Sequence, residues 1–128
     1  MPTPRFAARL TIVSASMFFA AAALAHPELL SSSPQHQSQA PAPAAITLKF
    51  SETLTPQFSS ANLVMTGMPG MPGHGEMKVG ASVSGASDGK TLVITPAARL
   101  MPGSYRVDWR AVSADTHPIT GKISFQVQ

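Results

Sequence analysis

Apolar and polar residues alternate through much of the chain beyond residue 45. Ile46, Leu48 and Phe50 are separated by polar residues, which is the pattern of a strand with one buried face. Further short segments, several of them β-branched, follow with turn residues between them. The pattern predicts strands at residues 45–50, 62–65, 79–83, 91–95, 105–112 and 122–127.

The segments between these strands contain the residues that favour turns. Residues 87–90 contain Ser, Asp and Gly, residues 102–104 are Pro-Gly-Ser, and residues 31–43 are rich in Ser, Gln, Ala and Pro, so we expect turns and an irregular connection there. No window beyond residue 25 shows a helical repeat with caps. The sequence therefore predicts an all-β fold, a small antiparallel Greek-key barrel or sandwich.

Residues 1–25 have the pattern of an export signal. Arg5 and Arg9 precede an apolar run over residues 10–24, and Ala23-Leu24-Ala25 supplies the small residues of a signal peptidase site. The run is short for a membrane span, which makes an N-terminal membrane anchor the less favoured alternative. We expect cleavage after Ala25, so that a single domain of residues 26–128 reaches the periplasm with His26 as its first residue.

Charge and cysteine content exclude some classes of function. Beyond the predicted signal, seven of the nine Lys and Arg face six Asp and Glu, so the sequence indicates no nucleic-acid partner and a soluble mature protein. The chain has no cysteine. No disulfide can therefore stabilise the domain, and any soft metal ligand must be a methionine.

Residues 66–77 fit no strand, and their composition indicates a metal site. Met65, Met68, Met71, His74 and Met77 recur at every third position, mainly among Gly and Pro. A thioether is a soft, uncharged donor that suits Cu(I), and an imidazole adds a stronger donor without charge. Core packing explains one or two of these methionines, Met65 above all, but not the whole set. We predict that three or four of the five bind Cu(I); a methionine-rich surface that docks peptides is the weaker alternative.

A second set of ligands lies near the two ends of the mature chain. As the first residue, His26 would offer both an α-amine and a ring nitrogen to one ion. Asp115 and His117 face the same side if their segment is extended, and Pro118 favours that conformation at His117. Alone, this pair would indicate a turn residue and a structural histidine. Together with His26 it makes a set of three nitrogens and one oxygen, which suits Cu(II) and, less selectively, Ni(II) or Zn(II). His36 lies in the polar connection and has no obvious partners, so we expect it to be exposed and non-ligating.

These residues resemble the CopC family of periplasmic copper-resistance proteins over the whole mature chain. The resemblance is carried by His26-Pro27, by Phe50-Ser51-Glu52, by the residues from Leu63 to Met71, by Val107 to Ser113, and by Asp115-Thr116-His117-Pro118-Ile119-Thr120-Gly121. It implies a cupredoxin-like or immunoglobulin-like β-barrel that holds Cu(II) with His26, Asp115 and His117. It also implies Cu(I) held by a subset of the residues in the methionine segment.

The chain departs from the family's pattern at one place. Pro72 and Gly73 displace His74 from its expected position, which makes His74 the least secure ligand. Glu52 is expected to support the Cu(II) site as a hydrogen-bond acceptor behind the ligands.

The resemblance implies a non-enzymatic copper carrier or buffer. Its partners would be an inner-membrane copper permease or a periplasmic multicopper oxidase. One rival is a copper monooxygenase that cleaves polysaccharides with an N-terminal histidine, but such an enzyme has no evident use for the methionine segment. Only Tyr105 and Trp109 offer large aromatic rings with polar tips, and both fall in one predicted strand. The other rival is a metal-free immunoglobulin-like docking module.

Overall fold

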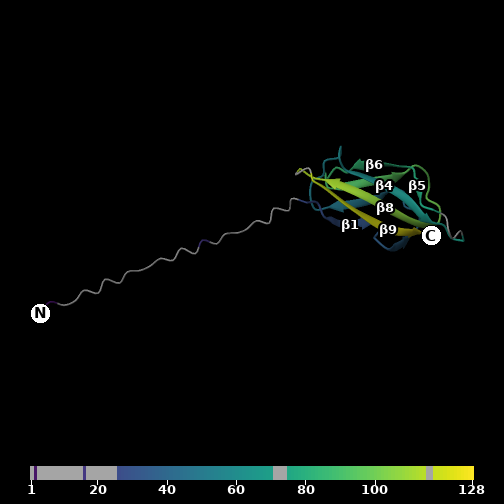
Figure 1. Cartoon of the computed structure of the whole chain (residues 1–128), viewed down its shortest axis with the longest axis horizontal. Coiled ribbons are helices and arrows are strands. Elements are labelled where there is room, and N and C mark those ends of the chain that lie inside the picture. The colour runs from purple at the N-terminus through teal and green to yellow at the C-terminus, as the bar shows by residue number, and fades with distance from the viewer. Residues whose placement is uncertain (1, 3–15, 17–25, 71–74, 115–116) are drawn as a thin grey trace.

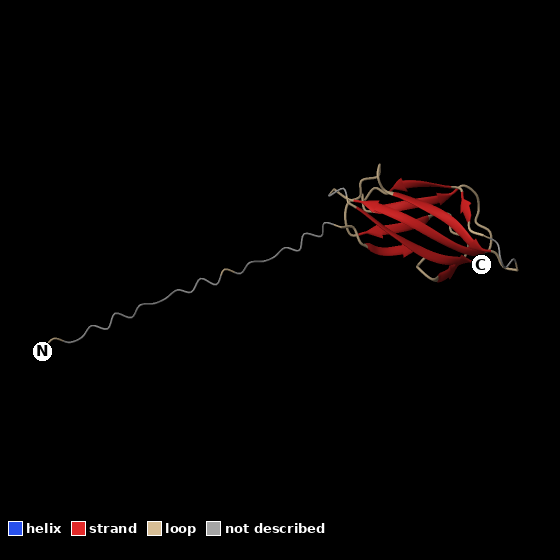
Figure 2. Ribbon diagram, viewed as in Figure 1, coloured by secondary structure: helices blue, strands red, loops and turns tan. Residues whose placement is uncertain are grey.

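The computed structural model of the chain describes residues 2, 16, 26–70, 75–114 and 117–128. In these residues the secondary structure is entirely strand, arranged as two sheets (Figures 1 and 2). The strands are β1 (Leu29–Ser33), β2 (Ser38–Ala40), β3 (Ile46–Phe50), β4 (Ser60–Gly67), β5 (Met77–Val79), β6 (Ala81–Gly85), β7 (Thr91–Pro96), β8 (Gly103–Val112) and β9 (Pro118–Val127). The predicted all-β class is confirmed. No helix in the described part of the chain has the length and apolarity to cross a membrane.

The larger sheet is organised around β8. Its strand order is β2-β9-β8-β4-β5, and the smaller sheet has the order β1-β3-β7-β6. β8 pairs with β9 over all ten of its residues, from Gly103 opposite Val127 to Val112 opposite Pro118, and the two strands run side by side in Figure 1. On its other side β8 pairs with β4. The named strand pairs are antiparallel except β2 with β9, which is parallel.

Alternate residues of both sheets meet in one apolar core, as the alternation in the sequence predicted. Because the chain has no cysteine, this packing carries the stability that a disulfide gives many small exported domains. The buried residues on the strands are Ile46, Leu48, Phe50, Leu63, Met65, Leu92, Ile94, Tyr105, Val107, Trp109, Ala111, Val112, Ile123, Phe125 and Val127.

Two predictions about individual elements were wrong. The expected strand at residues 79–83 is two strands, β5 and β6, which belong to different sheets, with Gly80 at the crossing between them. The polar connection at residues 31–43 contains the end of β1 and all of β2. The strands β1, β2, β5 and β6 are all edge strands, and every residue of β6 is exposed. Without a buried face they show no alternation of apolar and polar residues that the sequence could reveal.

Trp109 of the core packs closely against Gly121, where the backbone carries no side chain. They lie opposite each other across β8 and β9, and a Cβ atom on Gly121 would overlap with the indole ring of Trp109. The other side of the packing comes from the smaller sheet, where Phe50 meets the indole edge-on with ring centroids 5.0 Å apart. Glycine at position 121 thus leaves the space that the indole fills.

Replacing Gly121 with Ala should lower the free energy of unfolding by about 1–3 kcal/mol, because the added methyl group forces the packed indole to move. Urea denaturation followed by Trp109 fluorescence measures the change. Gly85→Ala is the matched control: it also lies in a strand, but the nearest atom to its new Cβ is Pro56 Cγ at 3.8 Å. Equal losses in both variants would contradict the proposed role of the contact.

Candidate metal sites

The predicted metal ligands that the structure describes fall near the two ends of β8. Met65 pairs with Tyr105 near the start of β8. His117 directly precedes Pro118, which pairs with Val112 at the end of β8. An extended strand rises about 3.3 Å per residue, so roughly 23 Å separates Tyr105 from Val112. The two ends cannot share a ligand.

We call the end of the larger sheet near Val112 and His117 the histidine end. There, hydrogen bonds connect the first residues of the domain to the segment after β3. The Glu28 N–H donates to Ser51 Oγ at 2.9 Å, and the Ser51 N–H donates to the carbonyl oxygen of Glu28, also at 2.9 Å. Pro27 is fully buried. The position of His26 is therefore set by its neighbours in the chain.

The segment after β3 is in turn fastened to the end of β8. The Thr55 N–H donates to the Val112 carbonyl at 2.7 Å, and Leu54 forms an antiparallel bridge with Ser113. Ser59 adds a buried hydroxyl that accepts from the Val112 N–H at 3.0 Å. These bonds bring the N-terminal segment to the place where β8 ends and the chain turns toward β9.

The result is that His26 and His117, which are 91 residues apart in sequence, lie together. Their ring centroids are 6.0 Å apart, their planes are inclined by 26°, and both side chains are exposed. A nitrogen ligand lies about 2.0 Å from its metal, so two imidazoles on opposite sides of one ion have centroids roughly 6.5 Å apart at most. The observed spacing therefore fits two ligands of a single ion.

The third predicted ligand at this end, Asp115, lies outside the described residues. Within 26–70, 75–114 and 117–128, no three His, Asp or Glu side chains gather as a complete metal site. The structure thus brings two of the three predicted side chains together and does not test the third. Glu52 is half-buried on the neighbouring segment, and its supporting role stays a prediction.

At the opposite end of the larger sheet, near Met65 and Tyr105, a pocket of about 460 Å³ is lined by four methionines. We call this the methionine end. Met65, Met68 and Met77 were predicted ligands; Met71 and His74 lie outside the described residues. Met65 is 9% exposed and belongs to the core, as the alternative of core packing had indicated, whereas Met77 is 53% exposed. Met68 is partly buried against the core. These thioethers range from buried to accessible around one opening.

The fourth methionine of this pocket, Met101, was not predicted as a ligand from the sequence. It is 57% exposed, and its carbonyl oxygen accepts a hydrogen bond from the Tyr105 hydroxyl at 2.6 Å. In the sequence it stands alone before Pro102-Gly103, far from the methionine segment. Only the pairing of β4 with β8 reveals that it lies near the others.

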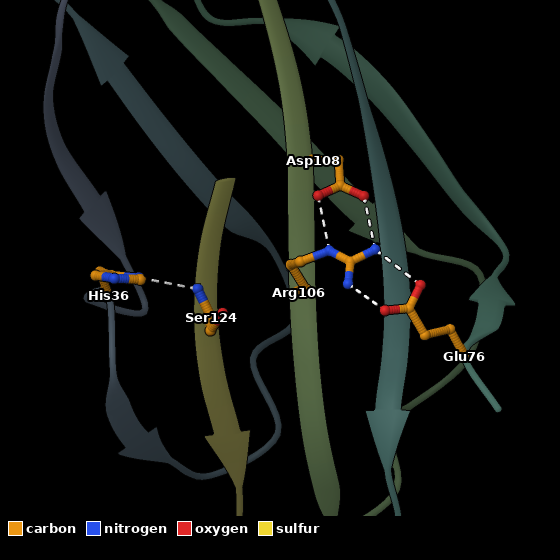
Figure 3. Close-up of polar contacts among 5 residues, drawn as sticks. All are labelled: His36, Glu76, Arg106, Asp108 and Ser124. Atoms are coloured by element: carbon orange, nitrogen blue, oxygen red, sulfur yellow. Dashed lines mark hydrogen bonds and ion pairs between the residues drawn. The ribbon is translucent and has the colours of Figure 1, made fainter. Parts of the chain in front are cut away.

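Arg106 binds Glu76, the residue directly before β5. Its guanidinium donates to both carboxylate oxygens of Glu76, with Nη2 at 3.0 Å from Oε2. It also donates to Asp108, with Nε at 2.7 Å from Oδ1 (Figure 3). The hydrogen bond from Arg106 lowers the pKa of Glu76, which keeps the carboxylate charged. Because Glu76 directly precedes Met77, this contact ties the start of β5 to β8 across the intervening strand β4.

His36 has a structural contact that the sequence did not indicate. It is exposed, as predicted, but its Nδ1 accepts a hydrogen bond from the Ser124 N–H at 3.0 Å (Figure 3). The neighbouring Gln37 N–H donates to the Ser124 carbonyl. Local sequence patterns do not indicate this contact, because it depends on the pairing of β2 with β9.

Comparisons with known proteins identify the family and support the fold. Residues 29–128 match the CopC domain. Copper resistance protein C of Pseudomonas syringae pv. tomato is 57% identical over 119 residues, which cover 93% of this chain and 94% of that protein. Copper resistance protein C of Escherichia coli is 55% identical over 112 residues, covering 88% and 89%. The crystal structure of PcoC, a methionine-rich copper resistance protein from E. coli, matches with a TM-score of 0.76 at 55% identity and covers 81% of this chain and 100% of that one.

The contact between Arg106 and Glu76 can be tested by hydrogen exchange. Glu76→Gln should reduce the protection of the β5 amides, because the neutral amide holds the Arg106 guanidinium less strongly. Since the pKa of Glu76 is lowered in the folded protein, the contact stabilises at neutral pH and is lost as the pH falls through that lowered value. The difference between wild type and variant should therefore vanish in acid. Glu28→Gln, an exposed control away from β5, should leave the protection unchanged; a loss of protection there too would argue against a local effect.

Proposed function

The chain belongs to the CopC family, and on that premise we propose that it is a non-enzymatic periplasmic carrier or buffer of copper with a role in copper resistance. The relatives are copper resistance proteins by name, not enzymes. The proposal assigns Cu(II) to the histidine end of the sandwich and Cu(I) to the methionine end. The single observation that supports it is that the described candidate donors of two chemical kinds, imidazoles and thioethers, lie at opposite ends of the larger sheet.

The histidine end suits Cu(II) in its donor chemistry. His26 and His117 supply imidazoles at a spacing that one ion can bridge, and Asp115 would add a carboxylate. Nitrogen and oxygen donors favour tetragonal Cu(II). After cleavage behind Ala25, the α-amine of His26 would be a further nitrogen donor beside its own ring. In the uncleaved chain that nitrogen belongs to a peptide bond and is no ligand. Export would thereby complete the site.

The methionine end suits Cu(I). The proposed ligands are drawn from Met65, Met68, Met71, His74 and Met77, all neutral donors that match a soft monovalent ion. The range of exposure of Met65, Met68 and Met77 supports a site near the surface, where an ion can enter and leave. We further propose that copper passes from here or from the histidine end to an inner-membrane permease or a multicopper oxidase.

Replacing Met68 and Met77 together with Met71 by Leu should abolish tight Cu(I) binding and leave Cu(II) binding nearly intact. Leucine keeps the size and apolarity of the side chain and removes the sulfur donor. Competition with a chromophoric Cu(I) chelator under reductant measures the first effect, and a Cu(II) titration in air measures the second. Undiminished Cu(I) affinity in the triple variant would place the soft-metal site elsewhere.

An extra Gly before His26 should weaken Cu(II) binding sharply and leave Cu(I) binding almost unchanged. The extension converts the α-amine into a peptide nitrogen and keeps the His26 side chain. Cu(II) titration of mature and extended proteins, each with its N-terminus established by mass spectrometry, makes the comparison. Equal Cu(II) affinities would remove the amine from the proposed ligand set.

A further inference from the structure

We infer that Met101 is an additional thioether ligand for Cu(I), so that the ion binds across the open end of the sandwich and not within residues 65–77 alone. The inference rests on the proposed Cu(I)-binding function. It adds a ligand from a different part of the chain, the connection between β7 and β8. That connection leads from the smaller sheet to the larger one.

The backbone around Met101 is held on both sides. Leu100 is buried at 5% exposure, and Met101 itself is 57% exposed. The Tyr105 hydroxyl donates to the Met101 carbonyl at 2.6 Å, and the Tyr105 side chain is buried at 1% exposure. An exposed methionine on a fixed backbone fills no gap in the core, so packing does not explain its place in the pocket.

Strand pairing brings the other thioethers to the same opening. Met77 lies opposite Met65 across β5 and β4, and Met65 lies opposite Tyr105 across β4 and β8. Residues directly opposite in a sheet point to the same face. Met68 follows from the end of β4 and lines the same pocket. Three chain segments thus contribute methionines around one opening, and the flexible side chains let their sulfurs converge on one ion.

The rest of the pocket lining favours a soft ion over a hard one. Among the described residues that line it, no carboxylate or imidazole is present, and the charged ones are Lys78 and Arg99. A hard divalent cation finds no anionic ligand here and meets two positive charges. A monovalent ion that is bound by uncharged sulfur suffers less from that repulsion, because both its charge and its need for anionic ligands are smaller. Binding then depends on the number of thioethers, so the additional sulfur of Met101 strengthens it.

The test uses the purified protein labelled with ¹³C at the methionine methyl groups. Silver(I), a soft monovalent ion that needs no reductant, is added stepwise, and methyl resonances are assigned with single Met→Leu variants. We expect the Met101 methyl signal to shift in step with those of Met68 and Met77.

Met101→Leu should also weaken Cu(I) binding at least roughly tenfold, since even groups that only support a ligand are worth about 10- to 100-fold.

A second variant, Arg99→Gln, should change the Cu(I) affinity in the opposite direction. Removing this positive charge from the pocket lining should raise Cu(I) affinity if the ion lies between Met101 and the 65–77 segment. Shifts of Met68 and Met77 without Met101, together with full Cu(I) affinity in Met101→Leu, would overturn the inference and leave the proposed function standing. No shift of any of these methyl groups would overturn both. Methyl shifts with an added methionine-rich peptide but none with silver would instead mark a docking surface and also refute the inference.

Discussion

The backbone pairing of β8 with β9 and β4 holds the two candidate sites apart and in place. β8 pairs with β9 along its full length, so the distance between its ends is that of an extended strand. With no disulfide available, only the register of this pairing and the core beneath it maintain that distance. A shift of the register by one residue would turn Trp109 outward and Arg106 into the core. The contact of Trp109 with Gly121 opposes such a shift, because Gly121 is the one glycine of β9 and a Cβ atom opposite Trp109 would overlap with the indole.

The histidine end depends on the smaller sheet as well. His26 precedes β1, whereas His117 precedes β9, and the two strands belong to different sheets. They come together because the segment after β3 is bonded to the N-terminal residues through Ser51 and to β8 through Thr55. A site built from both sheets forms only when the sandwich has closed. Its completion by an α-amine after export would make the finished Cu(II) site a property of the folded, processed protein.

The strands that alternate between buried and exposed residues could be predicted from the sequence, and the elements at the edges could not. β3 buries Ile46, Leu48 and Phe50, and that periodicity is visible in the residues themselves. β6 has no buried residue, so the pattern of apolar and polar residues does not show where β5 ends and β6 begins. The methionine segment could be recognised because its members are close in sequence. Met101 could not, because its place beside Met65 and Met77 results from the pairing of three strands. The same holds for Gly121, whose role is defined by the indole opposite.

Exposure of the proposed ligands bears on what kind of copper protein this chain can be. Met77 and Met101 are each more than half exposed, and His26 and His117 are exposed at the other end. A bound ion at either place is accessible to a ligand from a second protein, which can attach before the first ligand leaves. A storage site would bury the ion and slow that exchange. Under the proposed function, two accessible sites of different donor chemistry at the two ends of β8, about 23 Å apart along the strand, would instead let one molecule accept copper in either oxidation state and release each ion independently. This arrangement favours a carrier over a store.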